Sequence, residues 1–305
     1  MISQEAKGFL YLIVGIVLWS TAEVVIRSVN DVVSPIFLAW FRFALGSLVL
    51  MALLPMELKR RQLKLNGKIL LHAAWMAVLG IFLCGITLQL ALVHAGAGVV
   101  ATTYGAAPIM VFVFSRILLG DPMTWPRFLG VVCGFAGICV LALSEESVTF
   151  SLLGFGYILF NITCFALFTV FIKKYAGPFG GLPITALCFV FGSLYMMPFM
   201  FWEGQTELLT SWTAFREVAI PIIYLAIGTT GFAYLFYFMG LEKVDATQAI
   251  SVILLKPPLA TFLAWATLGE PVTWNLVFAM VLILGGLYLV NLMNRLRLGR
   301  ALARA

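Results

Sequence analysis

One lysine of this sequence lies where an ionised side chain needs a partner. Lys256 falls near the middle of the apolar run 246–268, which is long enough to cross a bilayer core of roughly 30 Å. An ionisable group at that depth costs a few kcal/mol or more if nothing neutralises it. The position therefore predicts that Lys256 pairs with another side chain, binds an anionic ligand, or is held snorkelling or neutral.

Glu23 and Arg42 are ionisable residues within the first two apolar stretches, at similar distances from the same predicted membrane face. Their matching depth predicts a structural ion pair, because two opposite charges buried together limit the cost that each would incur alone. The alternative is that Glu23 binds a proton or a substrate ammonium, with Trp19 one helical turn away on the same face. If Glu23 and Arg42 pair, Lys256 is left for a ligand carboxylate; a Lys256–Glu23 pair is the other arrangement that the sequence allows.

Several polar side chains in the other apolar stretches are candidates to line a substrate site. Tyrosine is also common as ordinary amphipathic packing, so each is a candidate only. No GxxxxGK[ST] loop is present, so we expect no ATP hydrolysis, and the cysteines show no metal-ligand spacing. We therefore expect a transport protein without catalytic residues, metal or cofactor. The expected substrate-binding residues are Lys256, Tyr104, Trp19, Glu23, Asn161, Tyr234, Tyr237, Gln89 and Gln248.

The composition indicates an integral membrane protein. Hydrophobic residues make up 63% of the 305 residues and charged residues only 10%, well below the roughly 25% charged residues of soluble domains. The connections between the apolar stretches are too short for a sizeable domain outside the membrane. We expect ten spanning helices, at about 8–28, 35–55, 70–93, 97–119, 126–143, 152–172, 183–202, 217–239, 246–268 and 274–294.

The basic residues are distributed unevenly between the two predicted membrane faces. If the N-terminus is cytoplasmic, 15 of the 19 Lys and Arg residues lie near the cytoplasmic face, five of them in the connection 59–68. Only Arg27 and Arg216 lie near the other face. The net charge of +6 therefore reports topology rather than nucleic-acid binding, and the positive-inside rule predicts that both termini are cytoplasmic.

The chain contains an internal repeat. The segment Leu119–Trp125, LGDPMTW, recurs as Leu268–Trp274, LGEPVTW, at an offset of 149 residues, and the same offset relates Pro108 to Pro257. The repeat predicts two similar halves of five spans each. Because five is odd, the second half must enter the membrane from the opposite side, and such inverted repeats are common in secondary transporters.

Prolines interrupt two of the expected spans near their middles. Pro108 lies in the fourth span, and Pro257 and Pro258 lie in the ninth. A proline inside a helix removes the amide that would bond the carbonyl one turn earlier, and a carbonyl freed in a membrane needs another partner. One interpretation is a tolerated kink in each span. The other, favoured by their equivalent positions in the two repeats, is a pair of hinges that bend during transport.

The sequence resembles the drug/metabolite transporter superfamily, and within it the EamA-type carriers with ten helices. The resemblance covers essentially the whole chain. It implies an alternating-access carrier, typically an exporter of amino acids or other small metabolites, with a central cavity lined by helices from both repeats. The matching features are the duplicated Gly-acidic-Pro segments, Leu18-Trp19, Pro35 followed by Ala39-Trp40-Phe41-Arg42, and the prolines within spans four and nine.

The chain departs from the family pattern at Ser20, where glycine is common, and at Glu23 and Lys256. Because Glu23 and Lys256 are not part of that pattern, they are candidates to set the substrate choice of this chain. We expect an all-helical membrane protein with one repeat over residues 1–146 and an inverted repeat over residues 147–305. The expected function is export of a small carboxylate-bearing metabolite or amino acid across the bacterial inner membrane, with proton or exchange coupling. The alternatives are a proton-coupled cation or multidrug exchanger that uses Glu23, and a membrane scaffold or sensor without transport.

Overall fold

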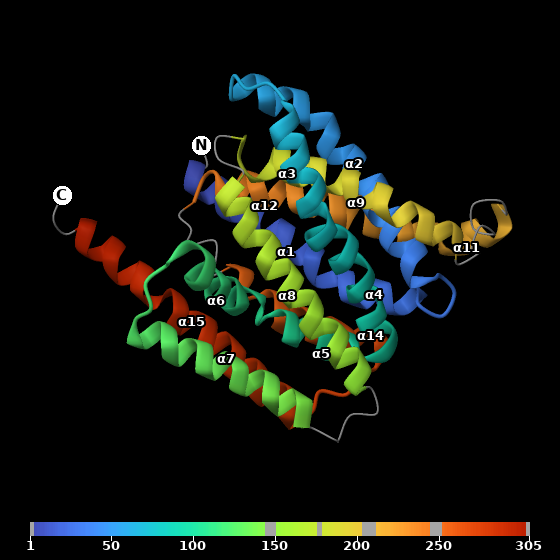
Figure 1. The fold of residues 1–305 in the computed structure, drawn as a ribbon. Coiled ribbons are helices and arrows are strands. Elements are labelled where there is room, and N and C mark those ends of the chain that lie inside the picture. Colours follow the sequence, from blue (N-terminus) through green and yellow to red (C-terminus); the bar gives the residue numbers. More distant parts are fainter. Residues whose placement is uncertain (1–2, 144–150, 176–178, 203–211, 245–251, 303–305) are drawn as a thin grey trace.

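The described part of the chain is helical throughout its regular structure (Figure 1). The computed structural model describes residues 3–143, 151–175, 179–202, 212–244 and 252–302. Its first half contains α1 (Gln4–Val29), α2 (Pro35–Arg60), α3 (Gly67–Ala77), η1 (Val78–Leu83), α4 (Cys84–His94), α5 (Ala97–Tyr104), α6 (Ala107–Leu119) and α7 (Trp125–Leu143). Its second half contains α8 (Leu152–Tyr175), α9 (Gly181–Trp202), α11 (Trp212–Ile223), η3 (Tyr224–Phe232), α12 (Ala233–Leu241), α14 (Lys256–Leu268) and α15 (Trp274–Leu302).

These elements confirm the expected ten-helix membrane fold. Within the described residues, eight helical stretches are long and apolar enough to cross a membrane, and 274–290 is a shorter apolar helix. The ninth span contributes α14 to the described structure. The beginning of α1 and the end of α15 lie at the same end of the bundle (Figure 1), as an even number of spans requires.

Local sequence signals fix several helix ends. The side chains of Ser3, Ser34 and Asn66 each accept a hydrogen bond from a backbone amide in the first turn of the helix that follows, which satisfies an amide that has no partner within the helix. The repeated Leu-Gly-acidic-Pro motif ends a helix in both halves. Gly120 and Gly269 adopt φ angles of 76° and 66°, a conformation that glycine enters without a Cβ penalty.

Spans four and nine are interrupted where the prolines were expected to act. In span four α5 ends at Tyr104, and α6 begins at Ala107 with Pro108 as its second residue. In span nine α14 begins at Lys256, so that Pro257 takes the position equivalent to Pro108. The two breaks touch, because a Cβ added to Gly105 would lie 2.8 Å from Pro257 Cγ. The breaks are thus present, and their bending during transport remains a prediction.

Spans three and eight each contain a π-helical segment that the sequence did not signal. These segments are η1 and η3, and the repeat offset of 149 residues maps η1 onto residues 227–232 within η3. A π-helical turn inserts an extra residue into the helix and is frequent at functional sites. Spans three and eight therefore carry matching irregularities, as spans four and nine do.

Helices α7 and α15 pack side by side along one edge of the bundle (Figure 1). A Cβ on Gly286 would lie 2.5 Å from the Gly130 carbonyl oxygen, and a Cβ on Gly137 would lie 2.8 Å from the Ala279 carbonyl oxygen. The repeat offset exchanges these two contacts, because it relates Gly130 to Ala279 and Gly137 to Gly286. The two repeats therefore meet here in a contact that is nearly symmetric.

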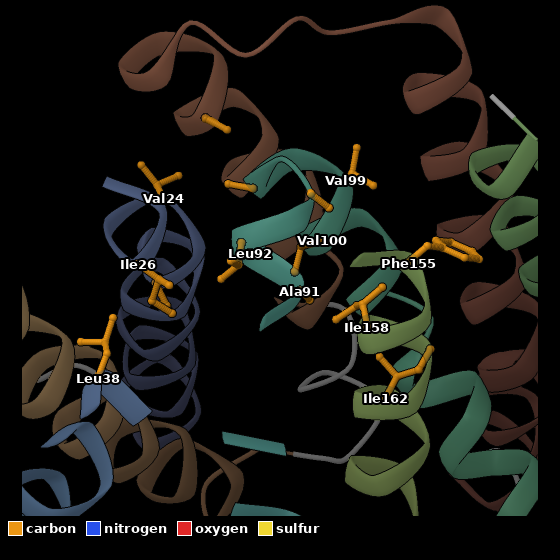
Figure 2. Packing of buried hydrophobic residues seen from close by; sticks show 14 of the residues in the cluster. Val24, Ile26, Leu38, Ala91, Leu92, Val99, Val100, Phe155, Ile158 and Ile162 are labelled. Atoms are coloured by element: carbon orange, nitrogen blue, oxygen red, sulfur yellow. The ribbon is translucent and has the colours of Figure 1, made fainter. Parts of the chain in front are cut away.

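The largest apolar cluster joins helices from both halves. Figure 2 shows its side chains from α1, α2, α4, α5 and α8, including Ile26, Leu38, Leu92, Val100 and Ile158. All five are fully buried. Because dispersion contacts between such side chains hold helices at close range, this cluster provides a rigid support for the polar residues on α1 and α4.

Candidate functional site

Lys256 and Glu23 form a buried ion pair. Lys256 Nζ lies 2.7 Å from Glu23 Oε1, and the exposed fractions of the two side chains are 15% and 2%. Lys256 is the first residue of α14, where the helix dipole already presents partial positive charge. An ammonium at that end of a helix needs an anion, and the Glu23 carboxylate supplies one.

The structure corrects the expected ion pair between Glu23 and Arg42. Arg42 Nε instead donates to Thr230 Oγ1 at 3.4 Å, and the guanidinium carbon lies 5.8 Å from the centroid of the Phe43 ring. The reason is the packing of the helices: α1 packs against α12, α14 and η3, whereas α2 packs against α9, η3 and α4. Helices that are consecutive in the chain are therefore not neighbours here, and equal depth did not bring the two charges together.

The Lys256 ammonium also contacts an aromatic ring. Nζ lies 4.4 Å from the centroid of Tyr104, within the range of a cation–π interaction. Ser20 Oγ donates to the Ile16 carbonyl at 2.8 Å and lies 3.5 Å from the Lys256 carbonyl oxygen. The three departures from the family pattern, Ser20, Glu23 and Lys256, thus lie together where α1 meets α14.

An aromatic cluster surrounds Trp19, which lies one helical turn from Glu23 on α1. The Trp19 ring is 4.8 Å from the ring of Tyr234 and 4.9 Å from that of Tyr237, and Tyr234 also packs at 5.0 Å against Phe189. Trp19, Tyr234 and Tyr237 each keep part of their surface exposed. The structure therefore brings these three expected site residues together, with Trp19 linking them to Glu23 along α1.

Asn161 braces two helices rather than reaching the ion pair. Its Nδ2 atom donates to the Cys84 carbonyl at 2.6 Å and to Thr87 Oγ1 at 3.1 Å, which ties α8 to α4. Gln89 on α4 is fully buried, and neither atom of its amide has a hydrogen-bond partner. Gln248 lies outside the described residues.

Two charged residues that were not among the expected site residues hold the connection between α4 and α5. Arg27 Nη1 donates to the Leu92 and Val93 carbonyls at 2.9 and 3.2 Å, at the end of α4. Glu270 accepts from the amides of Ala97 and Gly98 at 2.8 and 3.0 Å, at the beginning of α5. Each charge is opposite to the helix dipole that it faces. The only sequence signal for Glu270 was its place in the repeated motif.

At the other end of the bundle the corresponding acid, Asp121, makes different contacts. Asp121 Oδ2 accepts from the Ser115 hydroxyl and lies 3.2 Å from Lys173 Nζ. The Ser115 hydrogen bond, followed by the Lys173 charge, lowers the pKa of Asp121. The two acids of the repeated motif therefore have different partners in this structure.

A second charged cluster at that end joins α2 to the end of α12. Arg60 and Arg61 both bond the Glu242 carboxylate, and both also pair with Glu57. The hydrogen bond from Arg60 lowers the pKa of Glu242. Because these side chains are partly exposed, the cluster contributes little stability for each pair.

Comparison with known proteins identifies the chain's relatives. The model of the EamA-like transporter family matches residues 6–143 and again residues 152–292. The chain belongs to the EamA-like transporter family. This finding confirms the resemblance to EamA-type carriers of the drug/metabolite transporter superfamily, and the family accounts for a helical membrane fold built from two repeats.

Relatives in this family come from archaea, bacteria and plants. An uncharacterized transporter of Archaeoglobus fulgidus is 28% identical over 285 residues, covering 93% of this chain and 98% of that protein. The uncharacterized transporter YvbV of Bacillus subtilis is 25% identical, with 84% and 82% covered. A WAT1-related chloroplastic protein of Arabidopsis thaliana is 25% identical, with 90% and 66% covered.

A solved crystal structure has the same fold. It superposes with a TM-score of 0.63 at 20% identity, covering 95% of this chain and 98% of that one. The family match and the transporter relatives indicate a membrane transporter.

Proposed function

We propose that this protein is a secondary transporter that exports a small carboxylate-bearing metabolite or amino acid by alternating access. The observation that carries the proposal is the buried Lys256–Glu23 pair at 2.7 Å, at the point where the broken spans four and nine touch. A charge at a discontinuous helix is a common construction of substrate sites in carriers with inverted repeats.

The ion pair would stabilise the two buried charges whenever no ligand is bound. Each charge neutralises the other, so neither bears the full cost of burial alone. A ligand carboxylate would compete with Glu23 for Lys256, and the low exposure of both side chains strengthens such an electrostatic interaction. Lys256 begins α14 and contacts Tyr104 at the end of α5. A ligand that takes the place of the Glu23 carboxylate beside Lys256 would therefore act directly on the interruptions of spans four and nine.

The distribution of basic residues supports the proposed orientation, with both termini in the cytoplasm. The inner membrane as the location is part of the same proposal. Labelling of single cysteines placed in the connection 59–68 and beside Arg216 tests this orientation. The two positions should react from opposite sides of the membrane. Reaction of both from one side contradicts the topology.

Glu23 supports a second candidate, proton-coupled exchange of cations. Its Oε2 atom is buried and has no hydrogen-bond partner, so a proton or a cationic substrate would satisfy it. Protonation of Glu23 would release Lys256, which gives this exchange a physical basis. In this case the transported species is a cation, and Lys256 only competes with that cation for the Glu23 carboxylate.

The deciding experiment is counterflow of radiolabelled amino acids and carboxylates into proteoliposomes. We expect Lys256→Ala to abolish exchange of carboxylates, and Lys256→Arg to weaken it because a guanidinium has a different geometry. Lys243→Ala is the matched control, since Lys243 is partly exposed and bonds Gln4 at the end of the bundle. Unchanged carboxylate exchange in Lys256→Ala would reject the proposal. Exchange of amines that is lost in Glu23→Gln but kept in Lys256→Ala would favour the cation exchanger. No exchange of any solute would favour a scaffold or sensor.

A further inference from the structure

Arg42 is a buried cation with few partners. Its side chain is 6% exposed and lies within the second span. A guanidinium has five N–H donors and is not deprotonated in proteins. Among the residues that the structure describes, one of these donors has an acceptor, because Nε bonds Thr230 Oγ1 at the long distance of 3.4 Å. The carboxylate that acts on Arg42 electrostatically, Glu23, is bonded to Lys256 instead, so the burial of this charge calls for a further anion.

The π-helical segment of span eight holds Arg42 in place. Gly46 lies one helical turn after Arg42 on α2, and a Cβ added to it would be 2.8 Å from Thr230 Cγ2 and 2.9 Å from the Ala226 carbonyl oxygen. The Thr230 hydroxyl donates to the Leu225 carbonyl, five residues earlier in the chain, at 2.9 Å. Because the hydroxyl proton is used in this way, the oxygen is left to accept from Arg42. The segment η3 thus fixes the Nε side of the guanidinium and leaves its terminal nitrogens for another group.

Arg42 belongs to the same site as the Lys256–Glu23 pair. It interacts electrostatically with Tyr234, Glu23 and Tyr104. The Tyr104 ring also contacts the Lys256 ammonium, with Nζ at 4.4 Å from the ring centroid. The charged residues of α1, α2 and α14 therefore act on one another, although only Lys256 and Glu23 are in direct contact.

The three charges of this site do not cancel. Lys256 and Arg42 contribute two positive charges and Glu23 contributes one negative charge, so one net positive charge is left when no ligand is bound. A bound monoanion brings the total to two charges of each sign. A zwitterion would leave the excess positive charge in place, and a dianion would leave an excess negative charge. Either excess is costly inside a membrane.

The shape of the guanidinium selects a carboxylate. Its planar fork presents two parallel N–H donors, which match the two oxygens of a carboxylate. We infer that the terminal nitrogens of Arg42 bind the substrate carboxylate, with Lys256 as the second cation of the site, and that the substrate carries one net negative charge. This inference rests on the proposed function and narrows its substrate class from carboxylate-bearing molecules in general to net monoanions.

The test uses probes that differ by one group on the same carbon. One set is butanoate, 2-aminobutanoate and ethylmalonate, and the other is 3-phenylpropanoate, phenylalanine and benzylmalonate. At a pH where every carboxyl group is ionised, each set contains a monoanion, a zwitterion and a dianion, in that order. Affinities follow from thermal shifts of the purified full-length protein. We expect the monoanion of at least one set to bind about tenfold more tightly than the other two members.

The Arg42→Gln variant separates binding by Arg42 from a merely structural role. It removes the excess positive charge, so the zwitterion becomes the ligand that leaves the site neutral. We expect the affinity for the monoanion to fall about a hundredfold and the preference to pass to the zwitterion. A structural role would lower the affinity for all three probes alike. Arg42→Lys keeps the charge but not the planar fork, so it should keep the order of preference with about tenfold weaker binding.

Thr230 and Thr229 provide a matched pair of variants that leave Arg42 in the chain. Both hydroxyls donate to the Leu225 carbonyl, at 2.9 and 2.8 Å, and both side chains are 1% exposed. Of the two, it is Thr230 that bonds Arg42. We expect Thr230→Val to weaken binding of the monoanion about fivefold, through loss of the positioning of Arg42, and Thr229→Val to change it less than about twofold. This pair also serves if Arg42→Gln does not fold.

Each outcome has a defined meaning. Tightest binding of the zwitterion or the dianion to the wild-type protein overturns the monoanion and leaves the carboxylate transporter standing. Equal losses for all three probes in Arg42→Gln, or equal effects of the two threonine variants, overturn the assignment of Arg42 to the substrate carboxylate. Failure of every probe to bind the wild-type protein overturns the proposed function together with this inference.

Discussion

The Lys256 ammonium lies 4.4 Å from the centroid of the Tyr104 ring, and this contact joins the first residue of α14 to the last residue of α5. The positive charge of Lys256 therefore lies at the junction of α5 and α14, where spans four and nine are interrupted. We predict that Tyr104→Phe leaves the free energy of unfolding nearly unchanged, whereas Tyr104→Leu lowers it by about 0.5–2 kcal/mol through loss of the cation–π contact. Unfolding of both variants in detergent measures the difference, and equal stability would contradict it.

The ion pair should appear as a coupling between Glu23 and Lys256. Removal of one partner, as in Glu23→Gln or Lys256→Met, leaves a buried charge uncompensated and should cost about 3–5 kcal/mol of unfolding free energy. The double variant should cost clearly less than the sum of the two single losses.

A control double-mutant cycle combines Glu23 with Arg42 in place of Lys256. Arg42 is also a charged residue within a span, but it bonds Thr230. Glu23→Gln and Arg42→Met should show a smaller coupling, because the two charges interact at a distance without forming an ion pair. A larger coupling for Glu23 with Arg42 than with Lys256 would reject the arrangement described above. Denaturant titrations of the purified variants provide all of these energies.

The contact between the two repeats should tolerate no side chain at its centre. Gly286→Ala places a Cβ 2.5 Å from the Gly130 carbonyl oxygen, and overpacking of this kind costs about 1–3 kcal/mol. The neighbouring Gly285 faces open space where a Cβ would lie, so Gly285→Ala should be neutral or stabilise the helix by up to about 1 kcal/mol. Equal melting temperatures for the two variants would show that the close approach of α7 and α15 is not required.

The charged cluster around Glu242 should make a small, pH-dependent contribution to stability. The Arg60 hydrogen bond holds the pKa of the folded state below that of the unfolded state, so the contribution is present above the ordinary carboxyl pKa and is lost as the pH falls through the folded value. We expect Glu242→Gln to lower stability by at most about 1 kcal/mol at neutral pH. The difference between wild type and variant should vanish in acid, and a difference that grows on acidification would contradict the assigned sign.

The sequence predicted the spans and the repeat because both are written in local patterns. Apolar stretches of membrane length and the two LG-acidic-P segments need no knowledge of packing. The same reasoning found Glu23 and Lys256, since a charge in an apolar stretch is conspicuous. It paired Glu23 with Arg42, and this was wrong because the partner depends on which helix faces meet, and α1 faces α14.

Other features left no signal of their own. The π-helical segments η1 and η3 contain no proline between Val78 and Leu83 or between Tyr224 and Phe232, so the signal that located the breaks in spans four and nine does not mark them. The bonds of Arg27 and Glu270 join backbone groups at helix ends that only the folded chain brings close. Contacts between side chains and backbone far apart in the sequence therefore have to be read from the structure.

Glu270 allows a test of contacts between the two repeats, because this residue of the second repeat bonds the beginning of α5 in the first. Its carboxylate accepts from the amides of Ala97 and Gly98, and loss of such a cap costs about 0.5–2 kcal/mol. We predict that Glu270→Ala speeds hydrogen exchange at these two amides and lowers the melting temperature, with Glu270→Gln between it and wild type because a neutral acceptor bonds less strongly. Asp121→Ala is the matched control, since the equivalent acid bonds Ser115 and Lys173 and should leave the α5 amides protected. Unchanged exchange at Ala97 and Gly98 in Glu270→Ala would show that α5 is held by apolar packing alone.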